Sequence, residues 1–94
     1  MSKIKKIVVY EIKDDGLHNI GEKDIENDDI DDISITLASV STLGSPIDVI
    51  VKSYDILDNE ISSYKTQIKL PKNRIWNVST IENTMFIIHQ QYHA

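Results

Sequence analysis

The chain of 94 residues has the length of one domain, and 40% of its residues are hydrophobic, enough for a core without covalent cross-links. It contains no cysteine, which excludes disulfide bonds, thiolate catalysis, zinc knuckles and iron–sulfur clusters. Its net charge of −5 is unevenly distributed, because residues 14–32 hold nine acids and one lysine. This excess of acid argues against direct binding of DNA or RNA, whose phosphates attract lysine and arginine.

The N-terminus is basic, but the apolar run that follows stops at Tyr10–Glu11, too early for the h-region of a signal peptide. No run approaches the roughly 18 apolar residues of a membrane-spanning helix. We therefore expect a cytoplasmic protein of a bacterial host, without a membrane partner. Isoleucine dominates the apolar residues, and lysine, asparagine and aspartate are abundant among the polar ones, which suggests an AT-rich genome such as that of a phage or another mobile element.

The first predicted element is a strand over residues 4–13, in which β-forming residues alternate with polar ones. Its apolar face is interrupted only by Lys6 and carries Ile4, Val8, Tyr10 and Ile12. A turn is predicted at Asp14–Gly16, because glycine accepts positive φ without steric cost. Residues 17–32 have irregular apolar spacing, so we predict a loop there, with an acidic part at 21–32.

The cleanest strand pattern is Ile33, Ile35 and Leu37, which alternate with small residues and predict an apolar face toward the core. A connection of small residues follows at 39–46. Residues 47–51 alternate again, but the apolar phase changes before Tyr54 and Ile56. This change predicts a β-bulge near Lys52 and Ser53.

Asp58-Asn59 predicts a two-residue hairpin turn, since both residues tolerate left-handed backbone. The strand after it has one apolar face, formed by Tyr64, Thr66, Ile68 and Leu70, and it ends at Pro71.

Residues 74–92 allow two interpretations. Ser79–Glu82 resembles a capping box that would begin a helix. The β-forming residues at 74–78 and 85–91 instead favour two strands, with 79–84 as their turn, and we favour the strands. The sequence thus predicts a single all-β domain over residues 1–94, a small antiparallel sandwich or partly open barrel of five to seven strands with at most one short helix.

The acidic segment could be a calcium loop, a mimic of nucleic-acid phosphates or a solvated loop. A calcium loop that starts at Asp24 would have Asp29 where glycine is needed and Ile35 where a bidentate glutamate is needed, so we predict no metal site. A row of exposed carboxylates can instead occupy a groove shaped for phosphates. The solvated loop remains the simplest alternative.

Catalytic patterns are lacking in the sequence. His89 and His93 have the i,i+4 spacing of a helical zinc pair, but no third ligand accompanies them. Neither a glycine-rich phosphate loop nor a G-x-S-x-G nucleophile turn is present. We therefore predict no catalytic residue, no enzymatic activity and no cofactor.

Trp76 is expected in the core, although together with Arg74 it could form a docking patch if their common strand face were exposed. We expect a non-enzymatic module that binds another protein, in concrete terms a small acidic inhibitor acting on a partner with a basic, nucleic-acid-binding surface. We expect a monomer or homodimer. The alternative is a structural β-module of a phage particle or oligomeric assembly. The candidate partner-binding residues are Glu22, Asp24, Glu26, Asp28, Asp29, Asp31, Asp32, Arg74 and Trp76.

Overall fold

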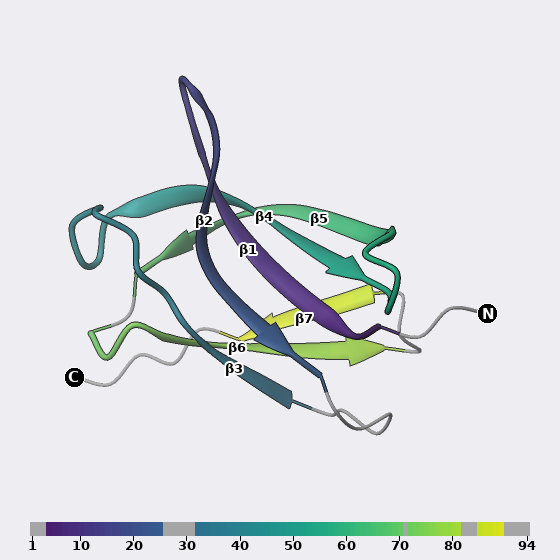
Figure 1. Ribbon diagram of the computed structural model, residues 1–94. Helices are drawn as coiled ribbons and strands as arrows, with labels where there is room; N and C mark the ends of the chain where they lie inside the picture. The colour runs from purple at the N-terminus through teal and green to yellow at the C-terminus, as the bar shows by residue number, and fades with distance from the viewer. Residues whose placement is uncertain (1–3, 26–31, 71, 82–84, 90–94) are drawn as a thin grey trace.

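The computed structural model describes residues 4–25, 32–70, 72–81 and 85–89, and these ranges contain seven strands and no helix (Figure 1). The strands are β1 (Lys6–Lys13), β2 (Gly16–Asp24), β3 (Asp32–Thr36), β4 (Pro46–Tyr54), β5 (Glu60–Lys69), β6 (Ile75–Ile81) and β7 (Met85–His89).

The strands form two facing sheets. The first has four strands in the order β2-β1-β4-β5, and the second has three in the order β3-β6-β7. Every pair of neighbours is antiparallel. Figure 1 shows the two sheets as separate layers that the chain crosses between β2 and β3, between β3 and β4, and between β5 and β6. The predicted antiparallel sandwich is therefore confirmed.

The hydrophobic core lies between the sheets and draws on both of them. Complete burial of a large apolar side chain contributes about 1.5–3 kcal/mol, so this cluster is the main source of stability. Trp76 of β6 is the largest side chain in it and is 0% exposed. The cluster consists of Ile4, Ile7, Val9, Ile20, Ile25, Ile35, Leu37, Ile47, Val49, Val51, Ile68, Leu70 and Trp76.

β1 turns to the core the face opposite to the one that its apolar residues predict. Ile7 and Val9 belong to the core, whereas Tyr10 lies on the outer face and bonds there with Tyr54. The opposite face of β1 is partly covered as well. Val8 on that face is only 2% exposed, although it does not belong to the core cluster. A strand in the middle of a sheet can be covered on both faces, so alternation alone does not give its orientation.

The loop predicted at residues 17–32 is wrong over its first half, because β2 pairs with β1 from Gly16 to Asp24. The pairing register shifts between Val9 and Tyr10, so that Ile20 is an extra residue in β2 and forms a bulge. Ile20 is buried, and its carbonyl oxygen accepts a hydrogen bond of 2.7 Å from the backbone N–H of Ala38. This hydrogen bond links the bulge of β2 to the chain that follows β3, and it thereby connects the two sheets along one side.

The register between β4 and β5 shifts between Ser53 and Tyr54, next to the predicted position. The bulge predicted in β4 lies in β5 instead, because Ser53 pairs with Ser62 and Tyr54 with Glu60, which leaves Ile61 as the extra residue. The predicted two-residue turn is wrong, because five residues, 55–59, separate β4 from β5. Asp58 does have the expected left-handed backbone, with φ of 63°. Ile56 is 78% exposed and does not continue the apolar face of β4.

The two strands favoured for the last quarter are confirmed as β6 and β7, which pair from Asn77 opposite His89 to Ile81 opposite Met85. β6 continues to Ile81, so the residues of the capping-box pattern that the structure describes belong to a strand. His89 is the last residue of β7, and His93 lies outside the described residues.

Candidate protein-binding surface

The acidic segment begins on an edge strand. β2 is the outermost strand of the four-stranded sheet, and its Glu22 and Asp24 stand opposite Val8 and Lys6 of β1 on the outer face. Both acids are exposed. Asp32 is the first residue of β3, while Glu26, Asp28, Asp29 and Asp31 lie outside the described residues.

The bulge in β2 is stabilised by the side chain of Asn19. Its Oδ1 accepts a hydrogen bond of 3.0 Å from the backbone N–H of Gly21, and its Nδ2 donates one of 3.0 Å to Oε1 of Glu22. The bulge therefore has a defined geometry, and it fixes the orientation of Glu22 at the edge of the sheet.

The β1–β2 hairpin extends beyond the body of the sheet, because β1 pairs with β4 only as far as Glu11 (Figure 1). Its tip carries two exposed acids, Asp14 and Asp15. Nε2 of His18 lies 2.7 Å from Oδ1 of Asp15, and this hydrogen bond, together with the charge of His18, lowers the pKa of Asp15. Acids therefore occur at both ends of β2.

Arg74 and Trp76 do not form the docking patch that an exposed strand face would have given. Trp76 is 0% exposed, which confirms its expected role in the core, and within the described residues its indole N–H has no hydrogen-bond acceptor. Arg74 precedes β6 and has a left-handed backbone, with φ of 58°, so the alternation of the strand does not extend to it.

The Arg74 side chain holds the connection between β3 and β4. Its guanidinium group donates a hydrogen bond of 2.7 Å to the carbonyl oxygen of Ser39. Its own carbonyl oxygen accepts a hydrogen bond of 2.7 Å from the N–H of Leu37. The contacts of Arg74 are thus structural.

A buried carboxylate that the sequence analysis did not single out lies nearby. Glu11 of β1 is 5% exposed and accepts hydrogen bonds from the hydroxyl groups of Ser39 and Ser41, the latter at 2.9 Å. Because burial of a carboxylate without partners is costly, these two bonds allow Glu11 to face the interior. Glu11 continues the inward positions of Ile7 and Val9, but the apolar pattern of residues 4–12 favours the opposite face and so does not indicate its burial.

The outer face of the four-stranded sheet carries a pair of tyrosines. The hydroxyl oxygens of Tyr10 and Tyr54 lie 3.1 Å apart, and burial, followed by this hydrogen bond, raises the pKa of Tyr54 above its ordinary range. Nζ of Lys6 lies 5.2 Å from the ring centre of Tyr54 and 3.4 Å from Oδ1 of Asp58. These contacts occupy Lys6, so this part of the face is not a free basic surface.

The described residues contain no group of three or more histidine, cysteine, aspartate or glutamate side chains that could hold a metal ion. In the same part of the chain, no helix is long and apolar enough to cross a membrane. Comparisons of the sequence with protein-family models and with curated proteins, and of the structure with solved structures, find no significant match to this chain.

Proposed function

We propose that this protein is a non-enzymatic module that binds a basic surface of another protein through the anionic edge of its four-stranded sheet. One observation carries the proposal: the edge strand β2 places Glu22 and Asp24 side by side on an exposed face. From there the sequence continues through further acids to Asp32. A field of one sign along one edge attracts a partner of the opposite sign and accelerates its association.

The concrete form of the proposal is a small inhibitor, encoded by a phage or another mobile element, of a protein that handles nucleic acid. Glu22 and Asp24 are two residues apart on one strand face, a separation of about 7 Å along the strand. Carboxylates spaced in this way can occupy a groove lined by lysine and arginine. This function requires a rigid scaffold and surface charge, and it requires no reacting group.

The test starts with the full chain as bait in a host lysate, followed by purification of the captured protein and measurement of its affinity. We expect the affinity to fall steeply between low and moderate salt, because electrostatic association is screened. Duplex DNA should compete for the same surface of the partner. An affinity that does not change with salt would exclude this function.

The matched variants are Glu22→Gln with Asp24→Asn, the set Asp28→Asn, Asp29→Asn, Asp31→Asn and Asp32→Asn, and the control Asp48→Asn. Asp48 is exposed on β4, away from the anionic edge. We expect each of the two acidic sets to weaken binding at least tenfold, which corresponds to about 1.4 kcal/mol. Equal affinities for all variants would contradict the proposal.

A second candidate function, a structural module of an oligomeric assembly, is favoured by the position of β5. This ten-residue strand forms the other edge of the four-stranded sheet and could pair with the edge of another subunit. Light scattering of the purified protein distinguishes the two functions. A stable ring or higher oligomer at micromolar concentration supports assembly, whereas a monomer or dimer supports the binding module.

A further inference from the structure

Two loops at opposite ends of β4 each expose large aliphatic side chains. The β4–β5 loop, residues 55–59, presents Ile56 and Leu57, which are 78% and 76% exposed. The β3–β4 connection, residues 37–45, presents Val40 and Leu43, which are 85% and 43% exposed. Because β4 runs from one loop to the other, the two loops lie at opposite ends of the four-stranded sheet (Figure 1).

The β4–β5 loop is held in one conformation by the carboxylate of Asp55. This carboxylate accepts hydrogen bonds of 2.9 Å from the backbone N–H groups of Leu57 and Asn59. Two backbone bonds close the loop, from Asp55 N to Asn59 O at 3.0 Å and from Asp58 N to Asp55 O at 3.1 Å. Ile56 and Leu57 are therefore presented at a small cost in conformational entropy on binding.

The β3–β4 connection is fixed as well. The hydroxyl group of Ser39 donates a hydrogen bond to Glu11, and its carbonyl oxygen accepts one from Arg74. The N–H of Gly44 donates a hydrogen bond of 3.1 Å to the carbonyl oxygen of Leu70. Val40 directly follows Ser39, which makes two of these hydrogen bonds. It is nevertheless the most exposed of the large apolar side chains in the described part of the chain.

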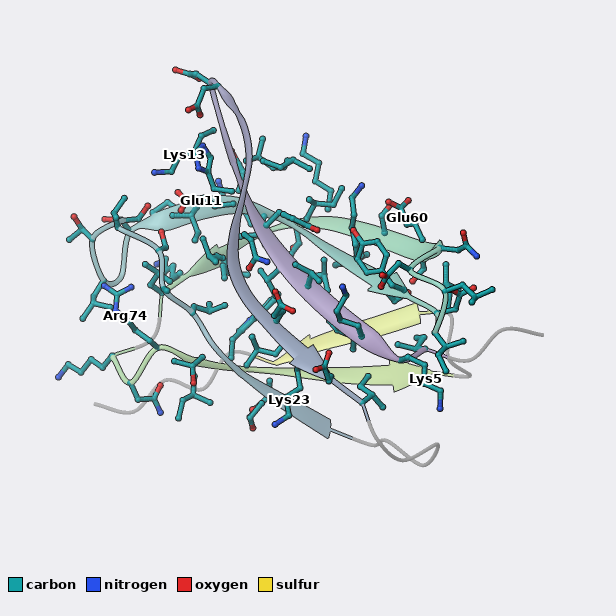
Figure 2. All side chains as sticks on the ribbon, in the orientation of Figure 1. Lys5, Glu11, Lys13, Lys23, Glu60 and Arg74 are labelled. Carbon is teal, nitrogen blue, oxygen red and sulfur yellow. The ribbon has the colours of Figure 1, made fainter. Side chains whose placement is uncertain are left out.

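The charges near the two loops differ in sign. Residues 55–60 contain three acids and no base, whereas residues 69–74 contain three bases and no acid. Figure 2 shows Glu60 at one end of the molecule and Arg74 at the other. Lys6 and Lys52 pair with Asp58 and Glu60 and offset part of the negative charge, so the complementarity is moderate.

We propose that copies of this chain associate head to tail, with Ile56 and Leu57 of one copy packed against Val40 and Leu43 of the next. The acids of residues 55–60 then approach the bases of residues 69–74 in the neighbouring copy. A second copy fits this surface better than an anionic bilayer does, because Asp55 and Asp58 flank the aliphatic pair and would be repelled by acidic lipids. A contact between two different surfaces forms rings or open chains and not only closed dimers.

The contact is small, so the association is weak. Interfaces below roughly 1,200 Å² belong to transient complexes, and we expect a dissociation constant on the order of 0.1–1 mM. The association adds to the proposed binding function and does not rest on it, because it uses neither Glu22 nor Asp24.

The test is sedimentation velocity of the full chain at protein concentrations up to about 1 mM, combined with variants of each loop. The double variants are Ile56→Ser with Leu57→Ser, and Val40→Ser with Leu43→Ser. We expect each one alone to remain monomeric at concentrations where the unmodified protein associates. Mixed together, they should form a one-to-one dimer and nothing longer, because the mixture retains one intact contact per pair.

The matched control is Tyr64→Ser in the middle of β5, which removes a side chain of 45% exposure far from both loops and should leave association unchanged. Urea unfolding confirms that each variant is folded before it is compared. A monomeric unmodified protein over the whole concentration range would overturn the proposal. The proposal would also be overturned if the double variants associated as strongly as the unmodified protein, or if their mixture formed no dimer.

Discussion

Gly21 of β2 packs so closely against Ile35 of β3 that a Cβ atom on Gly21 would lie 2.7 Å from Cγ2 of Ile35. The carbonyl oxygen of Thr36 would lie 2.9 Å from the same Cβ atom. Glycine is therefore required here by the approach of one sheet to the other, next to the bulge at Ile20.

The substitution Gly21→Ala is expected to lower the free energy of unfolding by about 1–3 kcal/mol, because the second sheet must shift to admit the methyl group. Urea unfolding at neutral pH measures this loss. The control is Lys23→Ala, two positions further along the same strand, where the side chain is exposed and the change should stay within about 0.5 kcal/mol. Equal stability of the two variants would show that the sheets do not touch at Gly21.

Removal of the buried carboxylate in Glu11→Ala should cost about 2–4 kcal/mol, because the hydroxyl groups of Ser39 and Ser41 lose their acceptor and a void remains. Glu11→Gln keeps one acceptor oxygen and nearly the same volume, so its loss should be smaller. Chemical denaturation of the three proteins measures the difference. If Gln and Ala destabilise equally, the hydrogen bonds are not the reason for the burial of Glu11.

The sequence predicted those strands whose apolar residues alternate and face one core. Ile35 and Leu37 are each 1% exposed, as their pattern required. The phase change before Tyr54 indicated a bulge on the wrong strand, because β4 keeps its alternation and the extra residue, Ile61, lies in β5. β2 was missed because only Ile20 of its residues is buried. An edge strand with a bulge has no alternation to detect, since one extra residue reverses its faces.

The charge of the candidate site could be predicted from the sequence, but its position in the fold could not. The acidic composition was visible in the sequence, but the position of Glu22 and Asp24 on a paired edge strand depends on the register with β1. Glu11 was not recognisable as an interior residue, because its partners Ser39 and Ser41 come from a connection 28 and 30 residues later. Contacts over such distances in sequence are set by topology, which periodicity does not reveal.

The pH dependence of stability should contain a contribution from Asp55. Hydrogen bonds from the backbone N–H of Asn59, and then from that of Leu57, lower the pKa of Asp55. A lowered pKa in the folded state means that folding favours the carboxylate. The stabilisation is therefore present above the ordinary aspartate pKa of about 3.9 and is lost as the pH falls through the lower folded value.

The measurement compares urea unfolding of the unmodified protein and of Asp55→Ala between neutral and strongly acidic pH. The variant should be less stable at neutral pH, and the difference should shrink below a pH of about 4. Asp55→Asn, which keeps one acceptor oxygen, should lie between the two at neutral pH. A difference that stays constant into strong acid would show that the charge of Asp55 makes no contribution to the loop.

Trp76 should report directly on the core, because it is the only tryptophan and is 0% exposed. We expect its fluorescence in the folded protein to be blue-shifted and protected from quenching by iodide, and both properties to be lost on unfolding. Trp76→Ala should cost about 3–5 kcal/mol, the range for removal of a large buried aromatic side chain. Because the variant has no tryptophan, its unfolding is followed by circular dichroism. Efficient quenching of the folded protein by iodide would place Trp76 at the surface. The face of β6 that carries Trp76 would then again be a candidate for docking.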